Sequence, residues 1–246
     1  MLIALVTWRG LPELAPDDRL LRDALLRRGV DARAVVWDDP QADWRSFDAI
    51  VVRSTWDYHR RIDEFRAWLD SMEGLPLWNP PAILRWNIHK SYLLDLQARG
   101  VNIVPTLIVR DYVVKPAISA TAYRTERHTT DHDVLVQPFV PEIAADGELS
   151  FVFLGRKFSH AVRKRPGNGD FRVQTEFGGS VEPFAPSADL IAQAERLAAT
   201  LGDEWLYARV DCVVRDGRLM LMELEATEPS LFLDAVSAER FADALT

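Results

Sequence analysis

Four charged side chains near the end of the chain are spaced in a way that could do chemistry. Arg209 and Asp211 lie two residues apart in one apolar run, and Glu223 and Glu225 lie two residues apart in the next. The Asp216-Gly217 pair between the runs is typical of a β-hairpin turn. Side chains alternate between the faces of a strand, so matching faces would bring three carboxylates and a guanidinium together. Such oxygen ligands suit Mg²⁺, whereas a solvated outer face is the simpler interpretation of this stretch alone.

The composition is that of a globular protein with an adequate core. The 246 residues are 48% hydrophobic and 27% charged, and the formal net charge is −8. This acidic balance argues against a nucleic-acid partner. The chain has no apolar run of membrane-spanning length, so we expect no membrane partner, and its apolar start predicts a first strand instead of a signal peptide. Cys212 is the only cysteine, which favours a reducing, cytoplasmic location.

The first third of the chain predicts a small doubly wound α/β domain. The predicted strands are 2–7, 32–37 and 48–53, and the predicted helices follow Asp17-Asp18 and span about 62–72. Ligands of such sheets bind at the carboxyl ends of the strands. The polar and aromatic residues after the third strand could therefore hold a small zwitterion, or they could form an ordinary loop with a helix cap. These residues run from Arg53 to Tyr58 and include Ser54, Thr55, Trp56 and Asp57.

A lysine in the middle of the chain is a candidate for binding an anion. Residues 85–96 predict one helix that carries Lys90. Lys115 ends an apolar strand and precedes a proline, which is a poor position for packing and a good one for gripping an anion. The strand predicted over 134–140 is broken at Pro138, so its unpaired backbone groups could read the edge of a purine.

A concentrated basic stretch follows two predicted antiparallel strands. Glu148 opens the strand 149–154, and 158–162 is predicted to return beside it. Residues 163–172 then predict a basic, glycine-containing loop. A run of like charge is more often a solvated surface than a site, but the clustering of four cations in an acidic chain makes a functional loop the alternative. The small, hydroxyl-rich stretch 117–125 would suit a loop over phosphates, although it contains no glycine.

Taken in order, these residues resemble the motifs of the ATP-grasp ligase superfamily over nearly the whole chain. The resemblance implies an α/β fold that is α+β in its C-terminal half. It divides the chain into an N-terminal pre-ATP-grasp domain (1–84), a central lid subdomain (85–136) and a C-terminal subdomain with the metal site (137–246).

The resemblance also implies a role for each candidate residue. The residues expected to bind ATP are Lys90 and Lys115 at the phosphates, Gln137, Phe139 and Val140 at the adenine, and Glu148 at the ribose. The expected ligands of two Mg²⁺ ions are Asp211, Glu223 and Glu225. The expected catalytic residues are Arg209, which would steady the transferred phosphate, Arg163 and Lys164. The expected substrate-binding residues are Ser54, Thr55, Trp56, Asp57 and Arg172.

The last metal-binding motif departs from the common form. Many members of the superfamily have Glu-x-Asn where this chain has Glu223-Leu224-Glu225, followed by Glu-Pro-Ser-Leu-Phe. This form resembles the cyclising members that convert O-ureido-D-serine to D-cycloserine in antibiotic biosynthesis, through an acyl phosphate made from ATP. Two alternatives stay open, namely a ligase that joins a carboxylate to a separate amine, as in dipeptide or glutamate ligases, and a non-catalytic nucleotide-binding regulator. The resemblance further suggests a small amino-acid-like substrate and a homodimer.

The middle of the chain is short for this superfamily. The spans 106–114 and 125–134 leave little room for the helices of a central ATP-grasp subdomain. Either the small subdomain is reduced here, or segments are absent from the sequence.

Overall fold

The computed structural model describes residues 1–118, 121–122, 124–167, 172–173 and 177–246. In chain order, its strands are β1 (Leu2–Thr7), β2 (Asp31–Val36), β3 (Ala49–Ser54), β4 (Leu77–Trp78), β5 (Leu107–Val114), β6 (Glu126–Val136), β7 (Glu148–Leu154), β8 (Lys157–Arg165), β9 (Ser180–Phe184), β10 (Tyr207–Arg215) and β11 (Arg218–Glu225). Its α-helices are α1 (Pro16–Arg27), α2 (Ile62–Ser71), α3 (Pro81–Asn87), α4 (Tyr92–Ala98), α5 (Pro141–Ala145), α6 (Ala188–Ala198) and α7 (Ala235–Leu245). None of the described helices is long and apolar enough to cross a membrane.

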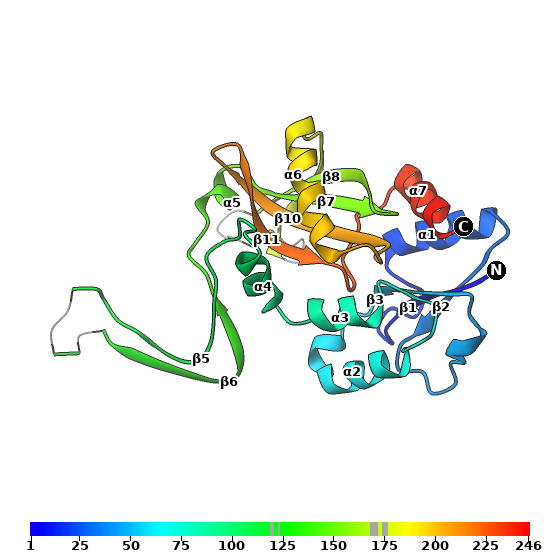
Figure 1. The fold of residues 1–246 in the computed structure, drawn as a ribbon, viewed down its shortest axis with the longest axis horizontal. Helices are drawn as coiled ribbons and strands as arrows, with labels where there is room; N and C mark the ends of the chain where they lie inside the picture. The colour runs from blue at the N-terminus through cyan, green and yellow to red at the C-terminus, as the bar shows by residue number, and fades with distance from the viewer. Residues whose placement is uncertain (119–120, 123, 168–171, 174–176) are drawn as a thin grey trace.

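The N-terminal part is a parallel sheet in the order β2-β1-β3-β4. Alternate side chains of β1 and β3 pack on opposite faces, and helices cover both faces, so the two central strands are continuous apolar runs. Helices α1 and α7 lie on one face, and α2 lies on the other (Figure 1). The strands and helices predicted for this part are confirmed to within two residues.

The C-terminal part is an antiparallel sheet in the order β11-β10-β7-β8-β9. One face of this sheet packs on α4 and α6, which contribute Leu96 and Ala194 to the core. The predicted hairpin of β10 and β11 is confirmed, and so is the predicted return of β8 beside β7. The acidic residues singled out above lie on the other face, which α4 and α6 do not cover.

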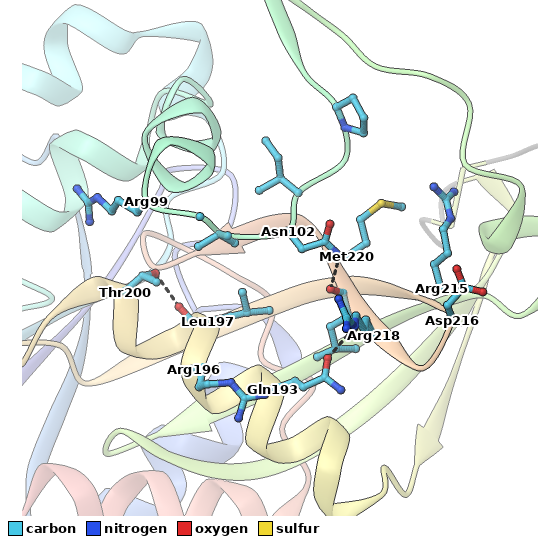
Figure 2. Close-up of a pocket in the computed structure, with 15 residues that line it drawn as sticks. Arg99, Asn102, Gln193, Arg196, Leu197, Thr200, Arg215, Asp216, Arg218 and Met220 are labelled. Carbon is cyan, nitrogen blue, oxygen red and sulfur yellow. Dashed lines mark hydrogen bonds between the residues drawn. The ribbon is translucent and has the colours of Figure 1, made fainter.

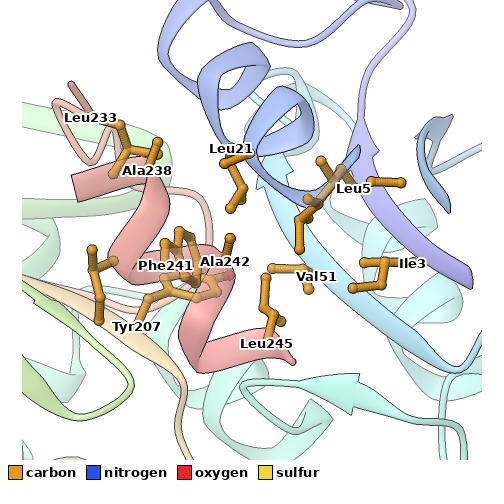
Figure 3. Packing of buried hydrophobic residues seen from close by; sticks show 14 of the residues in the cluster. Ile3, Leu5, Leu21, Val51, Tyr207, Leu233, Ala238, Phe241, Ala242 and Leu245 are labelled. Carbon is orange, nitrogen blue, oxygen red and sulfur yellow. The ribbon is translucent and has the colours of Figure 1, made fainter. Parts of the chain in front are cut away.

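The two sheets are joined by an apolar cluster around α7. Figure 3 shows Phe241 and Leu245 of this helix facing Leu5 and Val51 of the parallel sheet, with Tyr207 of β10 beside them. Phe241 is fully buried, and burying one such side chain stabilises a fold by roughly 1.5–3 kcal/mol. The C-terminal helix thus fixes the antiparallel sheet against the N-terminal one.

A buried asparagine makes a polar connection between the same parts. The Asn79 amide donates to the carbonyls of Tyr207 and Ala226 at 2.8 and 2.7 Å, and its oxygen accepts from the Leu206 amide at 2.7 Å. Asn79 has a positive φ of 56°, which asparagine tolerates better than most residues. One side chain therefore ties the end of the N-terminal part to the first residues of β10 and the end of β11.

Strands β5 and β6 form a separate two-stranded hairpin that projects from the rest of the chain (Figure 1). Most of its residues are exposed. Within the described residues of 107–136 there is no helix. The predicted central subdomain (85–136) therefore comprises α4, which packs on the large sheet, and this hairpin, and the limits of the subdomain stay a prediction.

Three local predictions are wrong. The helix predicted over 85–96 is two helices, because the chain turns at 88–91 between α3 and α4. The predicted basic loop begins later than expected, because Arg163 to Arg165 continue β8 and pair with β9. The strand predicted over 134–140 ends at Val136, before the proline that cannot donate to a sheet.

Candidate functional site

The ligand oxygens of Asp211, Glu223 and Glu225 converge on one point. One carboxylate oxygen from each residue lies within 4.8 Å of the others. Strand pairing explains this, because Asp211 is opposite Glu223 and Arg209 is opposite Glu225. Cross-strand neighbours on one face of an antiparallel pair are close enough for their side chains to meet.

A β-bulge turns the two glutamates toward this face. The register of the hairpin shifts between Asp211 and Cys212, so that Cys212 is opposite Leu221 and Met222 is an extra residue. With strict alternation, Glu223 would share the face of Leu221, which is the core face covered by α4 and α6. The extra residue instead places Glu223 beside Asp211, and bulges near active sites commonly redirect a side chain in this way.

Asp211 is buried and surrounded by donors. Its carboxylate accepts from Ser150 Oγ at 2.5 Å and from Arg209 Nη2 at 2.9 Å, and Lys164 Nζ lies 3.4 Å away. Burial alone would raise the pKa of this carboxyl. The charges of Arg209 and Lys164, with the hydrogen bonds from Arg209 and Ser150, outweigh burial and hold the pKa of Asp211 below its usual range.

The two glutamates also contact cations, but the site holds an excess of negative charge. Lys90 forms an ion pair with Glu223, and Arg209 Nη2 lies 2.6 Å from Glu225 Oε1. Burial raises the pKa of Glu225 to about 8, and the neighbouring carboxylates of Asp211 and Glu223 add to the rise against the opposing charge of Arg209. A carboxyl that is hard to ionise among other carboxylates is the condition that a divalent cation relieves. The donor set therefore fits Mg²⁺.

The predicted position of Lys90 is explained by the break between α3 and α4. Asn87, the last residue of α3, donates to the Leu224 carbonyl at 2.6 Å and accepts from the Ala226 amide at 2.7 Å. Tyr92, the first residue of α4, accepts a hydrogen bond from the Leu224 amide at 2.9 Å. These contacts hold the turn against the end of β11, which brings Lys90 to Glu223.

Glu148 and Lys164 form a second buried pair beside the first. Lys164 Nζ lies 2.5 Å from Glu148 Oε1 and also faces Asp211, because Glu148 and Lys164 are opposite each other on β7 and β8. One lysine thus connects the residue expected at the ribose with a residue expected at the metal. Both side chains are nearly buried, so their charges are poorly screened.

A small cavity of about 120 Å³ adjoins the carboxylates. Its lining includes Lys90, Glu223 and Glu225, together with Tyr58, the last residue of the segment predicted to hold a zwitterion, and Glu228, which was not predicted as a site residue. Tyr58 follows Asp57 and begins a single turn of 3₁₀ helix after β3. Glu228 is the first residue of the Glu-Pro-Ser-Leu-Phe motif, so the signal for it was present in the sequence without an assigned role.

The residues predicted to bind substrate after β3 divide into buried and accessible ones. Ser54 and Thr55 are fully buried, and Ser54 Oγ donates to Asp18 at 2.6 Å. Asp57 accepts from Trp37 Nε1 at 2.9 Å, whereas Trp56 is 39% exposed. The side chains of Ser54 and Thr55 therefore lie inside the loop. Substrate binding by these two residues, Trp56 and Asp57 stays a prediction.

The residues predicted to bind adenine lie just after β6. Gln137 Nε2 donates to Thr106 Oγ1 at 2.9 Å, Phe139 is 64% exposed and Val140 is buried. Lys115 directly follows β5, at the outer end of the projecting hairpin, and is exposed. The structure does not bring Lys115 to the carboxylates, so its contact with ATP stays a prediction.

The other predicted basic residues lie apart from the carboxylates. Arg163 packs over the ring of Phe184, with 4.5 Å between Cζ and the ring centroid, and pairs with Glu182 across β8 and β9. It alternates with Lys164, so it points to the other face of the sheet. Arg172 lies over the ring of Phe177. Residues 168–171 of the predicted basic loop lie outside the described residues. So does part of the hydroxyl-rich stretch 117–125, which was predicted to suit a loop over phosphates.

A larger cavity of about 1020 Å³ lies away from these residues (Figure 2). It is bounded by the segment after α4, by α6 and by the turn of the β10–β11 hairpin, and Arg99, Arg196 and Arg218 are among its lining residues. None of the predicted site residues lines it. The smaller cavity is therefore the better candidate for the functional site, because the acidic and basic groups converge there.

Comparison with known proteins gives this geometry a context. The family model described as the N-terminal domain of D-cycloserine synthetase DcsG matches residues 3–79. The curated "Cycloserine biosynthesis protein DcsG" from Streptomyces lavendulae is 29% identical over 294 aligned positions, which cover 99% of this chain and 97% of the relative. Because the alignment is longer than the 246-residue chain, the relative has residues without a counterpart here.

Solved structures agree with the sequence comparison. The crystal structure of D-cycloserine synthetase DcsG superposes with a TM-score of 0.80 at 28% identity, covering 100% of this chain and 98% of that one. The ATP-grasp ligase PsnB, complexed with minimal precursor, Mg and ADP, superposes with a TM-score of 0.60 at 15% identity over 99% and 97% of the two chains, which shows a shared fold.

The fold is that of the ATP-grasp ligases, and the similarity to D-cycloserine synthetase makes the chain a ligase of this fold. ATP and Mg²⁺ are general cofactors of this class of enzyme. Along its whole length, the chain resembles D-cycloserine synthetase DcsG.

Proposed function

We propose that the chain uses ATP and Mg²⁺ to activate the carboxylate of O-ureido-D-serine and closes it to D-cycloserine. The observation that carries this proposal is the convergence of Asp211, Glu223 and Glu225 beside Arg209 and Lys90, in a chain similar to DcsG along its whole length. Phosphoryl transfer to a carboxylate assembles several anions, and catalysis then consists mainly of positioning and of stabilisation by cations.

The three carboxylates would hold the metal. Mg²⁺ held there, expected as two ions, would neutralise the negative charge that develops on the phosphates of ATP during transfer. Lys90 would leave Glu223 for a phosphate oxygen as the metal takes over that carboxylate. Arg209 is held by Asp211 and Glu225 and is buried, so its guanidinium is already oriented for the transferred phosphate.

The reaction would proceed in two transfers. A carboxylate oxygen of the substrate attacks the γ-phosphorus of ATP, and ADP leaves, which gives an acyl phosphate. The ring-closing nitrogen of the ureido group then attacks the acyl carbon and loses its proton as phosphate departs, which forms the ring amide. Hydrolysis finally removes the carbamoyl group. Lys164 lies between Glu148 and Asp211, so it would link ribose binding to the metal site.

The cyclising reaction needs no second substrate, and this distinguishes it from an intermolecular ligase. We expect the purified chain to release phosphate from ATP and Mg²⁺ when O-ureido-D-serine is the only amino acid present. Phosphate release is measured with a coupled assay, and the ring product is identified by mass. An absolute requirement for a second amine would contradict the proposal and favour a dipeptide- or glutamate-type ligase.

A further inference from the structure

An irregular segment beside the site is held by side chains along its whole backbone. Residues 227–231 belong to no helix or strand, yet each of their five carbonyl oxygens accepts a side-chain hydrogen bond. The donors are Tyr207 Oη to Thr227 (2.8 Å), Trp56 Nε1 to Glu228 (3.2 Å), Arg53 Nη2 to Pro229 (2.9 Å), Arg209 Nη1 to Ser230 (2.9 Å) and His160 Nε2 to Leu231 (2.9 Å).

These donors come from both parts of the fold. Arg53 and Trp56 belong to β3 and the loop after it, whereas His160 and Arg209 belong to the antiparallel sheet. A loop whose carbonyls are bonded to packed side chains keeps one conformation without a helix or a sheet. Such support is what a side chain needs when it must contact a ligand within a fraction of an ångström.

Glu228 is the residue of this segment that lines the small cavity, together with Tyr58, Lys90 and Glu225. Asp211, Glu223 and Glu225 each form an ion pair with a lysine or an arginine. Among the residues that the structure describes, Glu228 forms no ion pair. Burial raises the pKa of Glu228 to about 7 against the opposing charges of Arg209, Lys90 and Arg53, none of which forms an ion pair with it.

The size of the cavity limits which cationic group could bind beside the Glu228 carboxylate. At about 120 Å³ it is far smaller than the roughly 300–1,000 Å³ of a nucleotide- or drug-sized site. A head group of a few heavy atoms fits beside Glu223 and Glu225, which line the same cavity. Tyr58 Oη would accept from the donor that binds Glu228, and Lys90 would leave the cavity edge on moving to a phosphate.

We infer that Glu228 is the specificity residue that recognises the α-ammonium group of the amino-acid substrate, with its carboxylate held in place by the bonded backbone of 227–231. This inference rests on the proposed function, because it names the contact that would orient the substrate carboxylate toward ATP. It assigns no part to Glu228 in binding ATP or metal.

The test compares Glu228→Gln with the unchanged chain on two substrates. One is O-ureido-D-serine, and the other is 3-(ureidooxy)propanoate, which differs only in lacking the amino group. Removing one partner of a desolvated charge pair should raise KM for O-ureido-D-serine by about 30-fold or more. The KM for ATP and the Mg²⁺ concentration for half-maximal rate should stay within about threefold, since neither contact is changed.

The decisive measurement is the ratio of kcat/KM for O-ureido-D-serine to kcat/KM for 3-(ureidooxy)propanoate. The unchanged chain should prefer O-ureido-D-serine, and Glu228→Gln should lose most of that preference. Glu228→Asp, which keeps the charge, should retain part of it. Glu195→Gln, at an exposed position on α6, is the matched control and should behave as the unchanged chain. An undiminished preference in Glu228→Gln would overturn the inference, and so would a shift confined to the Mg²⁺ dependence.

Failure of this inference can be told from failure of the proposed function. If the unchanged chain turns over O-ureido-D-serine while Glu228→Gln discriminates equally well, only the role of Glu228 is wrong. If the unchanged chain does not turn over O-ureido-D-serine, calorimetry with D-serine and 3-hydroxypropanoate still measures whether Glu228 reads an ammonium group. Equal binding of these two probes by the unchanged chain would then reject the role as well.

Discussion

The hairpin of β10 and β11 and the hairpin of β5 and β6 have the same local architecture and opposite surroundings. β10 is buried from Tyr207 to Val213, and buried side chains such as Asn79, Asn87 and Tyr92 hydrogen bond to the backbone of the pair. The described residues of β5 and β6 pack chiefly on each other and are mostly exposed. Their ion pair between Asp111 and Arg127 lies at the surface, where such pairs contribute about 0–1 kcal/mol.

This difference separates two tasks in a phosphoryl-transfer enzyme. The groups that stabilise charge must be in position before the reaction, and the buried hairpin holds them there. A segment that covers the nucleotide must let it enter and leave, which favours elements of low local stability. The contrast predicts that changes in the buried hairpin affect chemistry and folding, whereas changes in the projecting hairpin affect nucleotide affinity.

The largest expected effect is at the metal site. Glu223→Gln removes one of three converging charges and leaves the volume nearly unchanged. We expect turnover to fall by at least about 10³-fold, since metal positioning and charge stabilisation fail together. Phosphate release and the binding of a fluorescent ATP analogue measure the two functions, and nucleotide binding should persist in part.

Glu239→Gln, which changes an exposed carboxylate of α7, is the matched control for this variant. Turnover within a few-fold of the unchanged chain in Glu223→Gln would remove the metal assignment. It would also contradict the division of tasks between the two hairpins, because the buried β10–β11 hairpin would then hold no group that the reaction requires.

The next effect concerns the buried support of the site. Arg53 and Asp18 form a fully buried ion pair at 2.8 Å, and Arg53 also donates to the Pro229 carbonyl. Arg53→Met should destabilise the fold by about 3–5 kcal/mol, because it leaves the Asp18 charge buried without its partner. Urea unfolding measures this loss.

A double variant separates stability from support of the loop. Arg53→Met with Asp18→Leu removes both charges and should recover most of the stability. It cannot restore the bond to Pro229, so KM for the amino-acid substrate should stay raised. If the double variant recovered both the free energy of unfolding and KM for the amino-acid substrate, Arg53 would serve folding alone. The 227–231 segment would then not depend on it.

Much of the fold was readable from the sequence because its signals are local. The apolar runs of β1 and β3 and the Asp-Gly turn of the β10–β11 hairpin needed no tertiary information. The order of the ATP-grasp motifs then supplied the remaining architecture. The break between α3 and α4 escaped prediction because its cause is distant, namely the hydrogen bonds of Asn87 to the end of β11.

The site was predictable in its residue types and less so in its geometry. Alternation correctly placed Asp211 with Arg209, but only the bulge after Asp211 places Glu223 on the same face, and a bulge depends on the pairing of both strands. Tyr58 and Glu228 each belonged to a segment that the sequence singled out, but their meeting in one cavity could not be predicted, because it joins segments about 170 residues apart (58 and 228). Hydroxyl groups at Ser54 and Thr55 looked available in the sequence, and burial makes them internal.

A smaller effect is expected at the projecting hairpin. Lys115→Ala should raise KM for ATP by about tenfold, because it removes a phosphate contact made in both the ground state and the transition state. The free energy of unfolding should hardly change, since the side chain is exposed. Initial rates over a range of ATP concentrations test this, with Lys157→Ala at the exposed start of β8 as the control. A fall in kcat at unchanged KM would place Lys115 in the chemistry, against the division between the hairpins.

The smallest expected effect is a change in pH dependence within the support of the 227–231 segment. Burial lowers the pKa of His160, although the hydrogen bond to Leu231 opposes part of that shift. A carbonyl can only accept, so Nε2 carries the proton of the neutral ring.

A lowered pKa in the folded state means that the unfolded chain binds more protons as the pH falls below the ordinary histidine value of about 6.5. The neutral His160 ring therefore contributes to the free energy of unfolding at pH 7.5, and this contribution is lost progressively toward pH 5.5. His160→Gln should flatten the slope of unfolding free energy against pH in that window, by at most one proton, or about 1.4 kcal/mol per pH unit. Chemical denaturation at several pH values measures the slope, and His59→Gln reports the effect of replacing an exposed histidine. An identical slope in His160→Gln would mean that this bond to the segment adds no support, and the bonded backbone would then depend on Arg53, Trp56, Tyr207 and Arg209 alone.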